Sequence, residues 1–263
     1  MVKHPRCRSV CRIVADKSLI EKIRVLKSKH PFWGYRRIWA YLRFVAGLAV
    51  NKKHVYRLLK ENDLLVGKQT RLLAKRVSNT RKPRPNRANQ WWGIDMTKVM
   101  THDGWAYIVL VVDWYSKKVV GHYCGEQSKS WHWLLALNKA VNRQFPGGVR
   151  EMELDLNLMT DNGSQPTSRA FMETCSGLGI KQAFTAYNNP KGNADTERMM
   201  RTLKEELCWL QEWSSVVELK TALDTFVEDF NSGYLHSALG YKTPNAFEKE
   251  YFETRRATLI LAA

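Results

Sequence analysis

The stretch LMTDNGSQPTS, residues 158–168, ends an apolar run on an aspartate that directly precedes a turn signal. Asp-Asn-Gly is good turn chemistry, so one interpretation of Asp161 is that it starts a turn. A second interpretation is that a rigid strand end holds the Asp161 carboxylate to grip a metal ion. The residues on either side of the stretch decide between the two.

Three strand-like segments lie upstream of it. They are QWWGIDMTKVM (90–100), the continuous apolar run WAYIVLVVDWYS (105–116) and KKVVGHYCG (117–125), the last two separated by a polar turn at 116–118. A helix is expected over Ser130–Phe145. The segment LNLMT (156–160) is then a fourth strand, and it ends at Asp161.

Downstream, the pattern continues as helix, strand and helix. We expect a short helix over 168–179 with glycines at its end, a fifth strand over 180–185, and a long helix over 193–210 opened by Asn193. Three hairpin-connected strands followed by alternating helices and strands predict an α/β fold, with a mixed five-stranded sheet flanked by helices. This order matches the ribonuclease-H-like architecture.

Two further acids occupy special places in this arrangement. Asp95 lies within the first strand, and Glu197 lies about one turn into the last helix. In a ribonuclease-H-like sheet the first and fourth strands are neighbours, and the following helix lies across their ends. Asp95, Asp161 and Glu197 are therefore expected to converge, although 65 and 35 residues separate them along the chain.

Convergent carboxylates repel one another and stay ionised together only when a cation intervenes. Carboxylate oxygens are hard ligands that select Mg²⁺ or Mn²⁺. Two such ions about 3.5–4 Å apart activate a nucleophile and stabilise the leaving oxygen of an in-line phosphoryl displacement. Taken singly, Asp161 would be a turn residue and Glu197 a surface acid, so the prediction depends on the set.

Three other acids have structural interpretations. Asp113 precedes a hairpin turn, Asp155 starts its strand at the opposite end of the sheet, and Asp195 lies in a first helical turn, where it favours the helix dipole.

The 3.6-residue period of the helix over 193–210 gives it two faces. The apolar positions predict a core stripe made of Met200, Leu203, Leu207 and Leu210. Glu197, Arg201 and Lys204 share a neighbouring face, where the two cations are expected to meet a DNA phosphate. The alternative is a simple Glu197–Arg201 surface pair.

Charge is distributed unevenly along the 263 residues. Residues 1–88 hold 24 Lys and Arg against 4 Asp and Glu, a net charge of +20, whereas residues 89–263 hold 18 against 21, a net charge of −3. This asymmetry predicts a polyanion-binding segment joined to a near-neutral module. The alternative is a solvated basic surface.

Residues 1–66 are predicted to form a helical helix-turn-helix domain. Helical spacing recurs over 17–29 and 34–44, Gly47 marks a turn, and Asn51 is a plausible N-cap for a third helix. Lys52, Lys53 and Arg57, with His54, would lie near the start of the recognition helix and contact DNA. An ordinary helical hairpin is the alternative.

The remaining boundaries follow from composition. Residues 67–89 are basic and polar, with Pro83 and Pro85, and predict a linker that tracks a phosphate backbone. Residues 90–212 are the predicted ribonuclease-H-like catalytic core, and 213–263 a C-terminal helical extension.

The bulk composition excludes a transmembrane helix, because no run of 18 uncharged apolar residues exists. The charged start lacks the apolar segment of a signal peptide, so the expected location is the cytoplasm. The five cysteines are odd in number and scattered, which fits reduced thiols. A zinc site on His4, Cys7, Cys11 and His30 is disfavoured because Cys-x3-Cys matches the usual zinc spacings poorly.

Three motifs, WWGIDMTKV, LMTDNGSQ and NPKGNADTERMMRTLKEEL, resemble the DDE catalytic core shared by insertion-sequence transposases and retroviral integrases. The 35-residue gap between Asp161 and Glu197 is the spacing typical of that group. With GYRRIWAYL and VNKKHVYRLLKENDLL upstream and HSALGYKTPNAF downstream, the chain resembles the OrfB-type transposases of bacterial insertion sequences over residues 32–250.

The resemblance implies that Asp95, Asp161 and Glu197 are the metal-binding catalytic residues, with Mg²⁺ or Mn²⁺ as cofactor and two ions per site. The implied reaction is hydrolysis at a transposon 3′ end, followed by attack of the freed 3′-OH on target DNA, with no covalent protein–DNA intermediate. The implied partners are double-stranded DNA, namely terminal inverted repeats and a target, and further copies of the chain. An upstream helix-turn-helix and zipper protein is a further possible partner or fusion.

Two alternatives stay open at this point. A nuclease of similar fold would cut DNA without joining it, and a catalytically silent DNA-binding regulator would do neither. The intact acid triad argues against the regulator.

Overall fold

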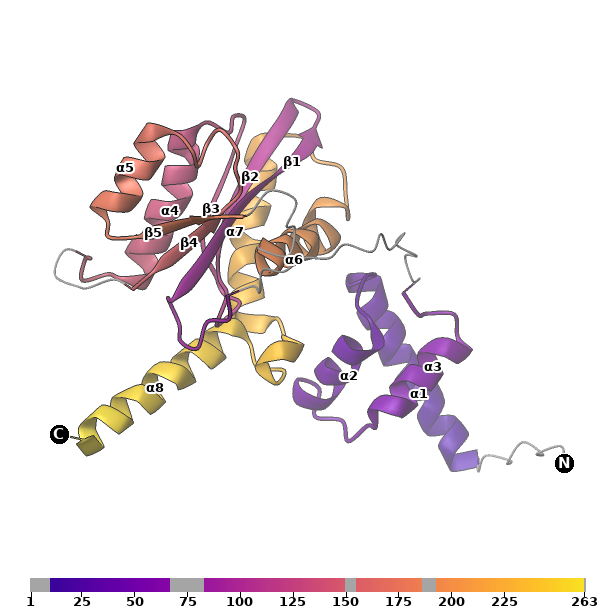
Figure 1. The fold of residues 1–263 in the computed structure, drawn as a ribbon. Coiled ribbons are helices and arrows are strands. Elements are labelled where there is room, and N and C mark those ends of the chain that lie inside the picture. The colour runs from indigo at the N-terminus through magenta and orange to yellow at the C-terminus, as the bar shows by residue number, and fades with distance from the viewer. Residues whose placement is uncertain (1–9, 67–82, 150–154, 186–192, 263) are drawn as a thin grey trace, which may run out of the picture. The chain divides into compact units, whose positions relative to one another are not determined.

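A computed structural model describes residues 10–66, 83–149, 155–185 and 193–262 (Figure 1). The chain divides into two compact units between Ala74 and Lys75. His4 and Cys7 of the disfavoured zinc site, and residues 67–82 of the predicted linker, lie outside the described residues. The finer boundaries predicted at 66, 89 and 212 stay predictions. Among the described helices, none combines the length and the apolar character needed to span a bilayer.

The first unit contains three helices: α1 (Val10–Lys29), α2 (Tyr35–Phe44) and α3 (Lys52–Glu61). Helix α1 begins earlier than the predicted residue 17. Asn51 caps α3 as predicted, because its side chain accepts a hydrogen bond from the Lys53 N–H at 2.8 Å. Gly47 has a φ of +67°, which suits glycine at the turn before α3.

Apolar residues recurring along all three helices meet in one core. They include Ile23, Ile38, Leu42, Val55 and Leu58, each with at most 1% of its surface exposed. The predicted helical spacing is therefore confirmed, because each of the three helices turns its apolar face toward one shared core.

The second unit is built on a five-stranded sheet with the order β3-β2-β1-β4-β5. Its strands are β1 (Trp91–Thr101), β2 (Gly104–Asp113), β3 (Val119–Gly125), β4 (Asn157–Thr160) and β5 (Lys181–Phe184). Strands β1, β2 and β3 are antiparallel, whereas β4 runs parallel to β1 and β5 runs parallel to β4. The prediction of a mixed ribonuclease-H-like sheet is confirmed.

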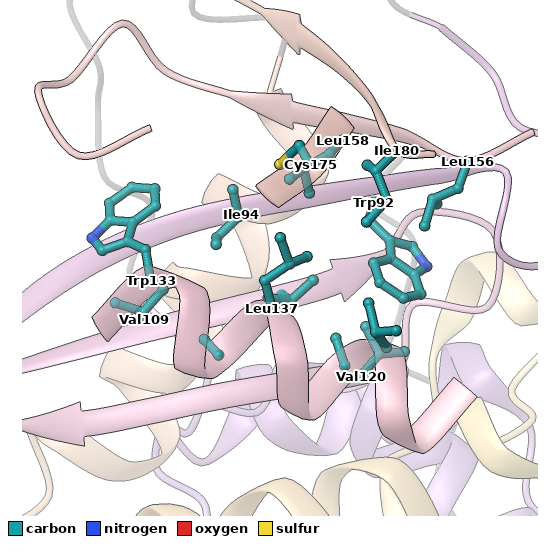
Figure 2. Close-up of a cluster of buried hydrophobic side chains, with 14 of the residues drawn as sticks. Trp92, Ile94, Val109, Val120, Trp133, Leu137, Leu156, Leu158, Cys175 and Ile180 are labelled. Atoms are coloured by element: carbon teal, nitrogen blue, oxygen red, sulfur yellow. The ribbon is translucent and has the colours of Figure 1, made fainter. Parts of the chain in front are cut away.

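Helices cover both faces of this sheet (Figure 1). They are α4 (Ser130–Gln144), α5 (Arg169–Gly177), α6 (Ala194–Leu203) and α7 (Val216–Gly233), whereas α8 (Pro244–Ala262) packs against α7 and extends away from the sheet. Figure 2 shows one of the two resulting cores, where Trp92 and Ile94 of β1 and Val109 of β2 lie against Trp133 and Leu137 of α4.

The alternation of β2 explains why its sequence is an unbroken apolar run. Val109 and Val111 point to the α4 side, whereas Ile108 and Leu110 enter a second core with α6 and α7. A strand buried on both faces needs apolar residues at every position.

Helix α7 is attached to the sheet through a buried amide. Asn231 is fully buried, and its Oδ1 accepts a hydrogen bond from the Val119 N–H while its Nδ2 donates one to the Val119 carbonyl, both at 2.9 Å. Leu219, Leu223 and Val227 of the same helix belong to the second core. The segment after 212 therefore contributes to the packing of the sheet.

We expect Asn231→Ala to lower the free energy of unfolding by about 2–4 kcal/mol, because it leaves two buried backbone groups of Val119 without hydrogen bonds. Urea denaturation followed by circular dichroism measures this. The matched control is Ser232→Ala on the exposed side of α7, expected within about 0.5 kcal/mol of wild type. Equal effects of the two substitutions would contradict the bridging role of Asn231.

Candidate acidic site at the end of the central strands

The parallel pairing of β1 and β4 aligns two of the predicted acids. Trp91, Trp92 and Gly93 pair with Asn157, Leu158 and Met159, an offset of 66 residues in each case. Asp95 and Asp161 are separated by the same 66 residues, so the register, carried two positions further, places them opposite one another. The predicted adjacency of the first and fourth strands is confirmed.

The local structure of Asp161 supports the turn interpretation as well. Its Oδ1 accepts a hydrogen bond from the Gly163 N–H at 3.1 Å, and Asn162 Nδ2 donates to the Thr185 carbonyl at 2.8 Å. These bonds tie the turn after β4 to the end of β5. Asp161 itself is exposed, so its carboxylate is accessible at a braced turn.

Helix α6, which carries Glu197, is seated on β1 by a close contact that the sequence did not reveal. Trp114 Nε1 donates to Thr196 Oγ1 at 3.0 Å, and both side chains are buried. A Cβ at Gly93 would lie 1.9 Å from that same Thr196 oxygen. Glycine at position 93 therefore allows the start of α6 to approach the strand that holds Asp95.

Helix α6 starts where the sequence predicts, but its first turn makes contacts that were not predicted. Asn193 occupies the N-cap position of α6, as expected, but its side chain makes no capping hydrogen bond. Lys117 Nζ lies 3.3 Å from Asp195 Oδ2, so these two side chains form an ion pair.

Asp95 is the electrostatic centre of the site. It is half-buried, and burial is the main cause that raises its pKa to about 6. A hydrogen bond of 2.8 Å from the Met96 N–H opposes this rise, the charges of Asp161 and Glu197 add to it, and Lys204 lowers the pKa again. Asp161, Glu197 and Lys204 thus all act on the carboxylate of Asp95, as expected of converging residues.

The three acids are electrostatic neighbours and do not form a closed coordination shell. Within the described residues, no group of three or more His, Cys, Asp or Glu side chains is arranged to hold a metal ion. Asp161 and Glu197 are both exposed. The chemistry of the donor set nevertheless suits a hard divalent cation, because such an ion would favour the ionised form of Asp95, which burial and, to a lesser extent, the charges of Asp161 and Glu197 disfavour.

The predicted core stripe of the last helix is wrong at its far end. Helix α6 stops at Leu203 and continues as the π-helical turn η2 (Lys204–Cys208), which shifts the phase of the residues that follow. Met200 and Leu203 are buried, but Leu210 is 43% exposed. A π-helical turn inserts one residue per turn, so a 3.6-residue count cannot hold through it.

The two basic residues predicted to face DNA, Arg201 and Lys204, make different contacts. Arg201 Nε donates to Glu205 at 2.7 Å, so the alternative pairing of Arg201 with Glu197 is not the one present. Lys204 is half-buried and acts on Asp95. The proposed contacts of Arg201 and Lys204 with DNA stay predictions.

The other acids behave as their structural interpretations expect. Asp113 is buried and accepts hydrogen bonds from the Ser116 N–H at 3.0 Å and the Ser116 hydroxyl at 2.6 Å, which confirms its turn role. Asp155 precedes β4, where it pairs with Arg87 and, at 3.2 Å, with Lys181.

In the first unit, the three predicted DNA-contact residues have different environments. Lys53 is exposed, Lys52 Nζ lies 4.2 Å from the Trp39 ring, and Arg57 donates to His54 Nδ1 at 2.6 Å. His54 Nε2 in turn lies 2.7 Å from Asp16 Oδ1 on α1. No local pattern along the chain indicated this link to Asp16, which holds α3 against α1.

A five-stranded mixed sheet with one acid within its first strand and another directly after the adjacent fourth strand is typical of the ribonuclease-H-like class of nucleic-acid enzymes. Comparison with protein families specifies the class. The model "Integrase core domain" matches residues 85–190, a second model of the same description matches 178–244, and "HTH-like domain" matches 14–71. The chain belongs to the integrase core family, and it is an enzyme of the DDE transposase and integrase class.

Individual relatives agree with this assignment. The chain is 25% identical over 245 residues to the transposase InsD for insertion element IS2A/D/F/H/I/K of Escherichia coli, covering 89% of this chain and 79% of InsD. Among solved structures, it matches a chain of the simian T-cell lymphotropic virus intasome in complex with the PP2A regulatory subunit B56 gamma. That match has a TM-score of 0.51 at 15% identity and covers 80% of this chain and 73% of the other, which supports the fold alone.

The raised pKa of Asp95 predicts a pH-dependent gain in stability for Asp95→Asn in metal-free buffer. The ordinary pKa of 3.8 applies when the chain is unfolded, and about 6 applies when it is folded, so wild type loses stability as the pH rises between these values. Asparagine does not titrate. The variant should therefore be more stable than wild type at pH 7, by roughly 2–3 kcal/mol, and the difference should vanish near pH 4.

Urea denaturation at a series of pH values measures the difference between the two proteins. Asp113, whose pKa is also raised to about 6, titrates in both and cancels. Asp155→Asn is the control, because Arg87 and Lys181 hold the pKa of that exposed acid below its usual value, with the Lys181 hydrogen bond as the first cause. A stability gain at pH 7 that persists unchanged at pH 4 would contradict the assignment to Asp95.

Proposed function

We propose that this chain is a DNA transposase that cleaves the 3′ ends of an insertion sequence and joins them to target DNA. The observation that carries the proposal is the action of Asp161, Glu197 and Lys204 on one half-buried carboxylate, Asp95. These residues come from β1, the turn after β4, and the α6–η2 segment. The similarity to InsD supports a role in transposition.

Asp95, Asp161 and Glu197 would hold Mg²⁺ or Mn²⁺, in pairs by analogy with two-metal enzymes. Such ions supply an activated oxygen nucleophile and stabilise the oxygen that leaves. The half-buried position of Asp95 keeps one ligand fixed on a central strand. The exposed positions of Asp161 and Glu197 leave the site open to a DNA backbone.

Lys204 would contribute charge of the opposite sign. It already lowers the pKa of Asp95, and a cation in this place favours the approach of a phosphodiester to an acidic site. In the first step, water displaces the 3′ oxygen at a transposon end. In the second, that freed 3′-OH attacks a phosphodiester of the target and displaces the target's own 3′ oxygen, so DNA is joined to DNA and no covalent bond to the protein is formed.

The first unit would supply affinity for the duplex. Its helices α1–α3 match the HTH-like family, and residues 1–88 carry a net charge of +20. We infer that Lys52, Lys53 and Arg57 contact the terminal inverted repeats, and that two DNA ends are held by more than one copy of the chain. A partner or fusion encoded upstream, and a location at the nucleoid, complete the proposal.

A nuclease that cuts without joining remains the second candidate, since the same acids would serve it. A silent DNA-binding regulator has less support, because DNA binding by itself does not require three acidic side chains to converge beside the central strand of the sheet. Joined products distinguish the transposase from both.

Glu197→Gln should abolish cutting and joining, because it removes one charge and one ligand oxygen without changing the helix. The assay incubates the protein with Mg²⁺ and labelled duplex that carries the inverted-repeat ends flanking the reading frame. Asp155→Asn, an acid at the other end of β4, should keep wild-type activity. Full activity of Glu197→Gln would remove Glu197 from the site, and cut but unjoined products in wild type would favour the nuclease.

Lys53→Ala should weaken binding of duplex DNA about equally for all sequences. Because one phosphate contact releases about one counterion, the slope of log K against log salt should become less steep by about 0.9. Electrophoretic mobility shifts at several salt concentrations measure the slope. Lys249→Ala on α8 is the matched control, and an unchanged slope for Lys53→Ala would contradict the placement of α3 on DNA.

A further inference from the structure

A groove with a volume of about 590 Å³ opens beside the acidic site, and none of the roles described above uses it. Its walls are the far half of the β1–β2 hairpin and the segment that follows α6. The residues that line it are Lys98, Val99, Met100, Thr101, His102, Trp105, Lys204, Cys208, Trp209, Gln211, Glu212 and Trp213.

The two walls are fastened together at the tip of the hairpin. The His102 N–H donates to the Trp213 carbonyl at 2.9 Å, and the indole of Trp213 is buried, with its Nε1 donating to the Cys208 carbonyl at 3.2 Å. The groove is therefore a built feature, because the segment after α6 is attached to the sheet.

The π-helical turn η2 places Trp209 on this wall. The Trp209 N–H donates to the Lys204 carbonyl at 2.9 Å, five residues back. This bond closes the π-helical turn and leaves the Trp209 side chain 62% exposed. π-helical turns are frequent at functional sites, where they project one residue out of a helical face.

The groove exposes aromatic and sulfur-containing surface next to ammonium groups. Trp105 is 43% exposed and Met100 is 55% exposed, and Lys98 Nζ lies 4.3 Å from the Trp105 ring. Glu212 is the one acid among the lining residues. Exposed indoles with neighbouring cations are the surface on which unpaired bases stack while phosphates are neutralised.

One residue, Lys204, links the groove to the acidic site. Lys204 lines the groove and also acts on Asp95. Val99 follows Asp95 by four positions on β1, which is about 13 Å at the usual strand rise of about 3.3 Å per residue. That length corresponds to about four nucleotides at the B-form spacing of about 3.4 Å per strand.

We propose that this groove binds unpaired nucleotides of the DNA strand next to the reacting phosphodiester, with a base stacked on Trp209 or Trp105 and phosphates near Lys98 and Lys204. The inference rests on the proposed function, because it takes the acidic site as the place where the phosphodiester lies. Bases inside a duplex already stack on one another and offer no face to a protruding indole. The ligand is accordingly a frayed or single-stranded end.

The experiment is photocrosslinking with the full chain in EDTA, so that binding is read without catalysis. The probe is a single strand of about 12 nucleotides, within the usual site sizes of about 4–16, in which thymidines are replaced by 5-iododeoxyuridine. This base crosslinks to aromatic side chains that it stacks on, and mass spectrometry identifies the peptide. The same strand annealed to its complement is the paired control.

We expect crosslinks on Trp209 or Trp105 with the single strand and at least about tenfold fewer with the duplex. Trp209→Ala should lower the crosslink to Trp105 about tenfold, whereas Trp209→Phe should retain it. Trp131→Ala, which removes an indole that is 55% exposed on α4, should change nothing. Circular dichroism checks that each variant is folded.

Crosslinks confined to residues outside the groove, or equal yields with single strand and duplex, would overturn the inference. A Trp105 crosslink that Trp209→Ala leaves unchanged would overturn the shared site. Glu197→Gln separates the two proposals. If the crosslinks persist in Glu197→Gln and the wild type neither cuts nor joins DNA, the groove still binds unpaired nucleotides. The proposed transposase reaction is then refuted.

Discussion

The repulsion among three carboxylates is the constraint on which the rest of this unit depends. Asp95, Asp161 and Glu197 come from segments far apart in the chain, and their charges raise the pKa of Asp95 beyond the effect of burial. Such an arrangement costs stability, so the rest of the fold must hold the acids in place. The parallel register of β1 and β4 enforces the first pair, and the contact of Gly93 with Thr196 brings in the helix of the third.

Each of these constraints depends on a specific contact between segments that are distant in the chain. Thr196 accepts the buried indole N–H of Trp114, and Asn162 fastens the turn after β4 to the end of β5. The two cores on either face of β2 hold the strands in place, and Asn231 attaches α7 to β3. The residues that hold the acids in position are thus uncharged polar or aromatic side chains and one glycine.

Much of the architecture could be predicted from the sequence, because it depends on period and turn chemistry. The unbroken apolar run of β2 indicated a strand, and Asp113 before its polar turn indicated a structural acid, as its bonds to Ser116 confirm. The adjacency of β1 and β4 followed from the order of elements. The helix capped by Asn51 followed from one side chain and its position.

The features that escaped prediction all depend on tertiary contacts or on a break in period. The close approach of residues 93 and 196 has no local signal, and neither does the link from Arg57 through His54 to Asp16. The π-helical turn defeats a 3.6-residue count, which is why Leu210 is exposed. The same turn projects Trp209 into the groove beside the acids.

The most direct test of the central claim is the binding of Mn²⁺ to the full chain with DNA present, followed by electron paramagnetic resonance. A shared site predicts that Asp95→Asn, Asp161→Asn and Glu197→Gln each weaken Mn²⁺ binding at least about tenfold, since even outer-shell partners of a metal contribute that much. It also predicts that combining two of the substitutions adds little, because the ligands act as a unit. Mn²⁺ binding that is indifferent to any one of the three acids would contradict the account.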